Sequence, residues 1–90
     1  MTTVILTANV KDDKAWERAY RSHGELFKAA GLGPFHYSLE DGHVVMSTEV
    51  DDVGAYMDFI KSKATQDAMK NDGVKRKSVQ IFVLDKTFTV

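Results

Sequence analysis

The dipeptide Asp41-Gly42 lies near the middle of this 90-residue chain, between two halves that each follow the order strand, helix, strand. Asp-Gly between alternating apolar residues is the strongest short-range indication of a two-residue β-hairpin turn. The turn sets a register with the opposed pairs Glu40 and His43, Ser38 and Val45, and His36 and Ser47. Two such halves joined by a hairpin predict one four-stranded antiparallel sheet with helices on one face.

The first half contains a strand, a helix and a second strand. Residues 3–10 are rich in β-branched residues and predict a strand, and Asp12 or Asp13 is the expected helix cap. A helix is predicted from Ala15 to Ala30, because apolar residues recur at steps of three and four. Gly31 is expected to end it, and alternation over residues 35–40 predicts the second strand.

The second half repeats this order. A strand over residues 43–50 is followed by Asp51 or Asp52 as the expected cap of a second helix, and the helical stripe is Val53, Tyr56, Met57 and Ile60. A break at residues 61–63 leads to a shorter helical piece that closes at Asn71-Asp72-Gly73. Residues 78–85 predict the fourth strand, and alternation continues through residues 86–90. The whole order is that of a ferredoxin-like βαββαβ fold of class α+β, with right-handed crossovers and residues 1–90 as one domain.

Composition excludes some functions and favours an oligomer. The chain has no cysteine, and its 12 basic and 13 acidic residues form no basic stripe, so we expect neither nucleic acid nor membrane as a partner. Three scattered histidines favour neither a metal site nor a metal cofactor. The first ten residues do not resemble a signal peptide, so a cytoplasmic location is the default expectation. A chain this short buries only about 60–65% of its unfolded surface, so we expect a partner subunit to add stability.

Apolar residues on both faces of the sheet predict a homodimer. Helices cover one face only, which leaves Ile5, Val45, Phe82 and Leu84 on the other. Leaving each large apolar side chain in water loses about 1.5–3 kcal/mol of burial free energy. We therefore expect two sheets to pack face to face. Residues 86–90 are expected to form an arm on the partner's sheet.

Several segments together resemble a known group of proteins. They are Val10-Lys11-Asp12, Trp16, His23, Phe27 to Leu32, Glu49 to Asp52, Asp67 to Lys70, and Gly73-Val74. The chain resembles small dimeric α+β barrel proteins, which are grouped with the antibiotic-biosynthesis monooxygenase-like domains. The resemblance covers nearly the whole chain, but its positions are mostly packing and capping positions.

The resemblance implies several activities, among them cofactor-independent oxygenation of aromatics, haem degradation, polyketide cyclisation and lactone isomerisation. Haem-degrading members carry an asparagine on the first strand, which Asn9 matches. However, Phe59 occupies the position of their tryptophan, and residues 69–71 contain no histidine at the position of their iron ligand. Haem degradation is therefore not expected, and no cofactor is implied.

Cofactor-independent chemistry requires an apolar cleft, a polar contact and a base. His23 is the candidate base, since it is the imidazole on the aromatic helix stripe. The candidate ligand-binding residues are Asn9, Trp16, Tyr20, Phe27, Tyr37, Met46 and Tyr56. The same stripe is typical of an ordinary core, in which His23 is only a hydrogen-bonded core member. Asn9 equally suits the end of a strand.

Two functions therefore follow from the sequence. The favoured one is binding of a small apolar or aromatic molecule, with cofactor-independent monooxygenation or polyketide-cyclase-like chemistry as the reaction. The alternative is a non-catalytic homodimeric interaction module. A cavity reaching His23 favours the first, and a closed core beneath Trp16 favours the second.

Overall fold

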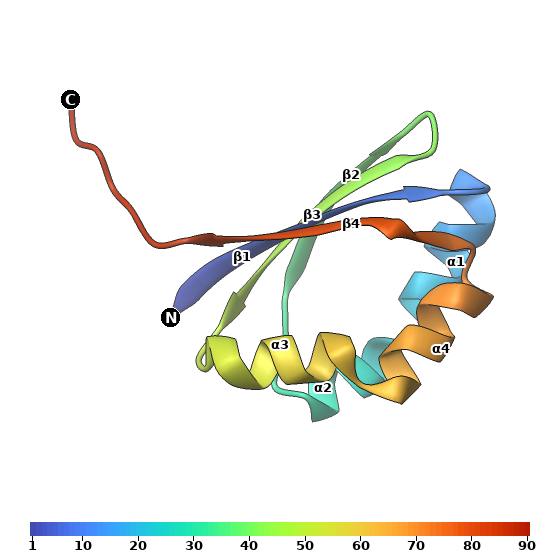
Figure 1. Ribbon diagram of the computed structural model, residues 1–90, viewed down its shortest axis with the longest axis horizontal. Helices are drawn as coiled ribbons and strands as arrows, with labels where there is room; N and C mark the ends of the chain where they lie inside the picture. Colours follow the sequence, from blue (N-terminus) through green and yellow to red (C-terminus); the bar gives the residue numbers. More distant parts are fainter.

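The computed structural model describes residues 1–90. It has two layers, with helices packed on one face of a single sheet (Figure 1). The elements are β1 (Thr2–Val10), α1 (Asp13–Ser22), α2 (Gly24–Ala29), β2 (Phe35–Glu40), β3 (His43–Val50), α3 (Val53–Lys61), α4 (Lys63–Asn71) and β4 (Val74–Leu84). The sheet order is β2-β3-β1-β4, and all neighbouring strands are antiparallel. Figure 1 shows the four helices on the same side of the sheet. The predicted ferredoxin-like α+β fold is confirmed.

The hairpin turn has the predicted register and a left-handed backbone. Asp41 and Gly42 have φ angles of +50° and +79°, as a two-residue turn requires. The opposed pairs on β2 and β3 are the predicted ones, from Glu40 with His43 to His36 with Ser47. The Gly42 N–H donates to an Asp13 carboxylate oxygen at 2.8 Å, and its carbonyl accepts from the Val10 N–H at 2.8 Å. The turn is thus fixed to the end of β1 and the start of α1.

Side-chain caps begin three of the helices. Asp12 caps α1 by accepting from the Ala15 N–H at 2.8 Å, and Asp52 caps α3 by accepting from the Ala55 N–H at 3.0 Å. Ser62 caps α4 through the Thr65 N–H. Each cap satisfies a backbone donor that the first turn of a helix leaves without a partner.

The prediction of one helix from Ala15 to Ala30 is wrong, because the chain breaks at His23 into α1 and α2. His23 has φ −92° and ψ 14°, and its N–H bonds the Tyr20 carbonyl three residues back. Gly24 follows, and glycine is about 1 kcal/mol less favourable than alanine inside a helix. The break places Trp16 and Tyr20 on one helix and Phe27 on another.

The fourth strand begins earlier than predicted, at Val74 rather than at Ser78. The β1–β4 register shifts between Thr7 and Asn9, which absorbs an irregularity and lets pairing continue to Val10 with Val74. At this shift the Ser78 hydroxyl accepts from the Asn9 N–H at 2.8 Å. Sequence alternation alone did not show that a bulge would extend the strand.

The buried core lies between the sheet and the helices. Its buried apolar members are Val4, Leu6, Ala8, Val10, Trp16, Val44, Met46, Val50, Tyr56 and Ile60. Trp16 is the largest of the fully buried side chains, with 2% exposure. The strand residues in this set alternate along β1 and β3, so their neighbours point to the other face.

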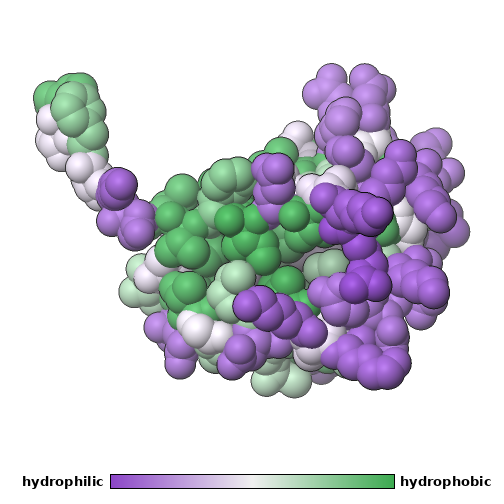
Figure 2. Space-filling model, viewed as in Figure 1, coloured by the Kyte–Doolittle hydropathy of each residue, from purple (hydrophilic) through white to green (hydrophobic).

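That other face carries no helix, and it keeps large apolar side chains in contact with solvent. Val45, Phe82 and Leu84 are 47%, 49% and 52% exposed. On the opposite, helix-facing side, Figure 2 shows hydrophobic atoms between β4 and α3. Residues 85–90 follow β4 as an exposed segment that projects away from the sheet (Figure 1). No helix is both long enough and apolar enough to cross a lipid bilayer.

Candidate functional site

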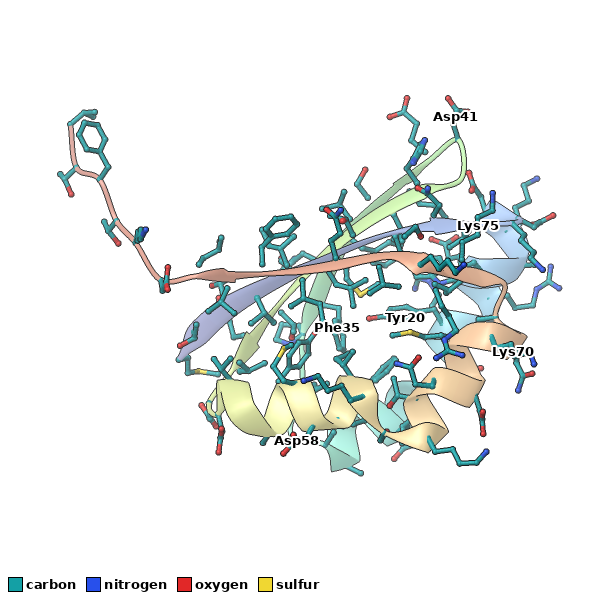
Figure 3. All side chains as sticks on the ribbon, viewed as in Figure 1. Tyr20, Phe35, Asp41, Asp58, Lys70 and Lys75 are labelled. Carbon is teal, nitrogen blue, oxygen red and sulfur yellow. The ribbon has the colours of Figure 1, made fainter.

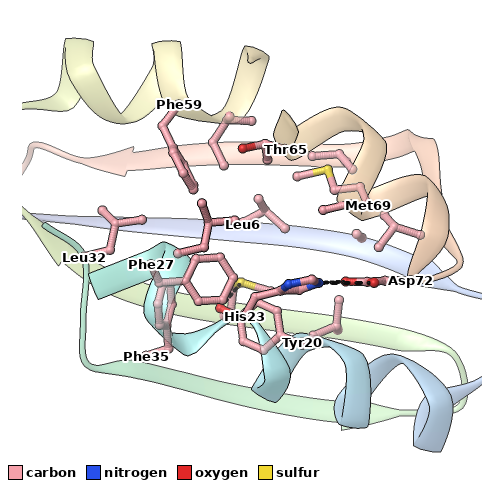
Figure 4. A pocket seen from close by; sticks show the side chains of 18 of the residues that line it. Leu6, Tyr20, His23, Phe27, Leu32, Phe35, Phe59, Thr65, Met69 and Asp72 are labelled. Carbon is pink, nitrogen blue, oxygen red and sulfur yellow. Dashed lines mark hydrogen bonds and ion pairs between the residues drawn. The ribbon is translucent and has the colours of Figure 1, made fainter. Parts of the chain in front are cut away.

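A pocket lies between the helices and the helix-facing side of the sheet. It encloses about 70 Å³, and 17 of its 20 lining residues are hydrophobic. The pocket wall includes parts of the strands, α1 and α2, and α3 and α4, so it lies at the junction of both halves of the chain (Figure 4). A mostly apolar cavity with few polar groups is the usual form of a small-molecule site.

Aromatic rings form one wall of this pocket. Trp16 and Tyr20 stack with centroids 4.8 Å apart, and Tyr20 lies 5.0 Å from Phe27. Phe27 in turn lies 5.0 Å from Phe35 and 6.4 Å from Phe59. These offset and edge contacts are favourable arrangements for aromatic pairs and fix the wall from three helices and β2.

Two tyrosines, Tyr20 and Tyr56, line the pocket, and both are neutral hydrogen-bonding groups. The Tyr20 hydroxyl donates to the Met46 sulfur at 3.3 Å. Burial raises the pKa of Tyr20 far above its usual value, and burial raises the pKa of Tyr56 to about 12. Neither phenol therefore acts as a base near neutral pH.

The pocket contains a hydrogen-bonded pair of polar side chains, His23 and Asp72. His23 Nε2 lies 3.1 Å from Asp72 Oδ2 and 3.4 Å from Oδ1. The side chains are 30% and 11% exposed. His23 lies at the break between α1 and α2, and Asp72 caps the C-terminal end of α4, so the pair joins the two helical halves (Figure 4).

Sequence reasoning missed Asp72 as a site residue. Asn71-Asp72-Gly73 predicts a helix end, and α4 does end there. No periodicity or spacing indicates that the end of α4 meets the end of α1, because that contact depends on how the helices pack. The one local signal for Asp72 was its place before Gly73, where the chain turns from α4 into β4.

The structure brings together six of the eight predicted site residues. Trp16, Tyr20, His23, Phe27, Met46 and Tyr56 all line the pocket. Their roles in binding or catalysis stay predictions.

Tyr37 and Asn9 lie outside the pocket. The Tyr37 hydroxyl donates to Glu17 Oε2 and accepts from Arg21 Nε at 3.0 Å. The hydrogen bond to Glu17 is the main cause that raises the pKa of Tyr37. Asn9 lies on the helix-free face, where its Oδ1 is 2.7 Å from His43 Nδ1. Asn9 is therefore placed as a strand-end residue.

Comparisons with known proteins give the fold. No family model matches the sequence, and no curated protein matches it either. Among solved structures, an antibiotic biosynthesis monooxygenase matches with a TM-score of 0.61 and 15% identity, over 98% of this chain and 100% of the other. The hydroxynitrile lyase from Passiflora edulis matches with a TM-score of 0.62 and 17% identity, over 98% and 96%.

A third solved structure bears on assembly. A dimeric ferredoxin-like protein from an uncultured marine organism matches with a TM-score of 0.52 and 15% identity, over 100% of both chains. Likeness at these identities shows the fold, and proteins that share a fold catalyse unrelated reactions. The chain therefore has the ferredoxin-like fold that is found in antibiotic-biosynthesis-monooxygenase-like proteins, as the sequence resemblance implied.

Proposed function

We propose that this protein binds a small apolar or aromatic molecule in the pocket between its helices and its sheet. The observation that carries the proposal is the composition of the pocket, where 17 of 20 residues are hydrophobic and one His–Asp pair is present. Placing the His23–Asp72 pair against an aromatic wall costs free energy in an ordinary core, because polar and charged groups lose contact with water there. A binding site needs both a dry wall and a polar group.

The size of the pocket limits the ligand. An engineered apolar cavity of about 150 Å³ holds one benzene molecule, and this pocket encloses about 70 Å³. A single ring therefore enters only if the wall moves. The wall contains the flexible side chains of Met46 and Met69, and none of the residues of α2 is buried. These features support a pocket that widens for one ring.

Cofactor-independent oxygenation by dioxygen, or cyclisation, is the reaction that we propose for this site. Both begin by removing a proton from the substrate, and His23 is the group that accepts it. Tyr20 and Tyr56 are neutral donors for a substrate oxygen, and Trp16 and Phe27 are apolar walls. The monooxygenase and the lyase of the same fold support a reactive pocket in this architecture.

Filling the pocket tests the proposal. The substitution Ala68→Leu on α4 adds three carbons at the pocket wall, whereas Ala64→Leu makes the same change at an exposed position of the same helix. We expect 4-nitroanisole, a neutral single-ring probe, to quench the fluorescence of the single tryptophan, Trp16, saturably in the parent protein and in Ala64→Leu. Ala68→Leu should abolish this binding while the circular dichroism spectrum is retained. Equal binding by all three proteins contradicts the proposed pocket, and so does an absence of binding.

A second function is favoured by a different observation. Val45 on β3 and Phe82 and Leu84 on β4 are exposed apolar residues of the helix-free face, which suits packing against a second copy of the chain. The dimeric protein of the same fold supports this assembly. A homodimer is compatible with ligand binding, but a dimer that binds no small molecule would be a non-catalytic assembly module.

A further inference from the structure

We propose that Asp72 is a positioning residue that holds His23 as a proton acceptor, and that the molecule in the pocket carries a hydroxyl group acidified by conjugation, as in a nitrophenol or an enol beside a carbonyl. This inference rests on the proposed function, because it assigns a ligand class to the same pocket. It adds a residue and a chemical step that pocket shape alone does not give.

The contact with Asp72 determines which ring nitrogen of His23 is basic. A carboxylate only accepts hydrogen bonds, so the neutral imidazole carries its proton on Nε2, which lies 3.1 Å from Asp72 Oδ2. Nδ1 then carries the lone pair, and it makes no hydrogen bond to another residue of the chain. A ring held in one tautomer, with the other nitrogen unpaired, is the arrangement of an oriented general base.

The position of Asp72 is unfavourable unless a cation forms beside it. Asp72 caps the C-terminal end of α4, where the helix dipole is negative and repels a carboxylate. Its side chain is only 11% exposed and lies against an apolar pocket. His23 is the group beside this carboxylate, so an imidazolium formed by proton transfer from a ligand would be paired with Asp72.

No other group in the pocket competes for the proton. The ionisable side chains of the wall are Tyr20 from α1, His23 between α1 and α2, Tyr56 from α3 and Asp72 from α4. The strands contribute none. Both tyrosines are neutral phenols, so neither accepts the proton.

The proposed step is a single proton transfer. The O–H bond of the ligand breaks, an N–H bond forms at His23 Nδ1, and the electron pair stays on the ligand oxygen. The resulting imidazolium lies between the Asp72 carboxylate and the phenolate or enolate. Proton transfer to an imidazole has little penalty only where the ligand hydroxyl is about as acidic as the imidazolium, and each further unit of mismatch costs tenfold.

The probe for this inference is 4-nitrophenol, whose phenolate absorbs visible light, and 4-nitroanisole is its matched control without a hydroxyl proton. In the parent protein we expect the bound nitrophenol to ionise at lower pH than the free molecule. Asp72→Asn and His23→Gln should each weaken binding of the phenolate about tenfold, since loss of one charged neighbour shifts such an equilibrium by about one unit or more. Binding of 4-nitroanisole should change less than about twofold.

The outcomes separate the inference from the proposed function. If neither probe binds the parent protein, the proposed function fails and the inference fails with it. If 4-nitroanisole binds but the ionisation of bound 4-nitrophenol is unchanged by either substitution, the proposed function stands and the inference is overturned. Equal weakening of both probes by Asp72→Asn also overturns it, because Asp72 would then act only on the shape of the pocket. Circular dichroism and the thermal midpoint verify that each variant is folded.

Discussion

The indole ring of Trp16 stacks on the phenol ring of Tyr20, with centroids 4.8 Å apart and an interplanar angle of 15°. Trp16 is buried in the core, whereas the hydroxyl of Tyr20 reaches the Met46 sulfur at the pocket wall. The stacked pair therefore connects the packing that holds α1 on the sheet with the surface that a ligand would touch.

Truncation of Trp16 should be severely destabilising. Removing a large buried aromatic costs about 3–5 kcal/mol, and small domains have only about 5–15 kcal/mol in total. We expect Trp16→Ala to lower the free energy of unfolding by about 3 kcal/mol or more, measured by urea unfolding with far-ultraviolet circular dichroism. Tyr37→Phe is the control, because it removes one hydroxyl from a surface cluster with Glu17 and Arg21. A loss below about 1 kcal/mol for Trp16→Ala would show that α1 is not held by this ring.

The strands, caps and hairpin register could be predicted from local signals. Asp41-Gly42 fixes the pairing of β2 and β3, and alternation along β1 separates the core face from the open face. The helix break at His23 and its contact with Asp72 could not be predicted in this way. Both depend on how α1, α2 and α4 pack on one sheet, and the two residues are 49 positions apart.

The open face of the sheet should control self-association. If two sheets pack face to face, Val45→Lys removes about 1.5 kcal/mol of apolar burial from each of two symmetry-related side chains, or about a hundredfold in Kd. Sedimentation equilibrium should show a dimer for the parent protein and dissociation for Val45→Lys. Ala64→Lys introduces the same charge on the exposed face of α4 and should leave the dimer intact. An unchanged monomer in all three proteins would contradict the expected assembly.

The segment after β4 offers a separate test of the proposed arm. Phe88 is 86% exposed, so most of its apolar ring is left in contact with solvent. If residues 86–90 lie on the partner's sheet, Phe88→Asp should raise the Kd of the dimer at least tenfold without changing the unfolding of the monomer. Lys86→Asp is the control, because it also introduces a negative charge in this segment but removes no aromatic ring. The same Kd for the parent protein and Phe88→Asp would remove the arm and leave the sheet contact untouched.

Alkaline pH should destabilise the protein through its buried tyrosines. Burial raises the pKa of Tyr56 from 10.0 to about 12, so the folded protein holds this proton more tightly than the unfolded chain does. The stability from this group is fully present below pH 10 and falls as the pH rises towards 12, by about 1.4 kcal/mol per unit. Burial raises the pKa of Tyr20 in the same direction. Urea unfolding at about pH 9 and pH 11 should show the loss, and Tyr56→Phe should show a smaller one. Identical losses in the two proteins would rule out Tyr56 as a cause.

The hairpin turn should tolerate no side chain at Gly42. Its φ of +79° is strained for any L-residue with a side chain, and a Cβ there would lie 3.2 Å from the Val10 carbonyl oxygen. We expect Gly42→Ala to lower the free energy of unfolding by more than about 1 kcal/mol. Gly24→Ala is the matched control, because a Cβ at Gly24 meets no atom within 4 Å and alanine is the better helix former. Urea unfolding should therefore give changes of opposite sign, and a loss of equal size in both variants would contradict the strain argued for a side chain at Gly42.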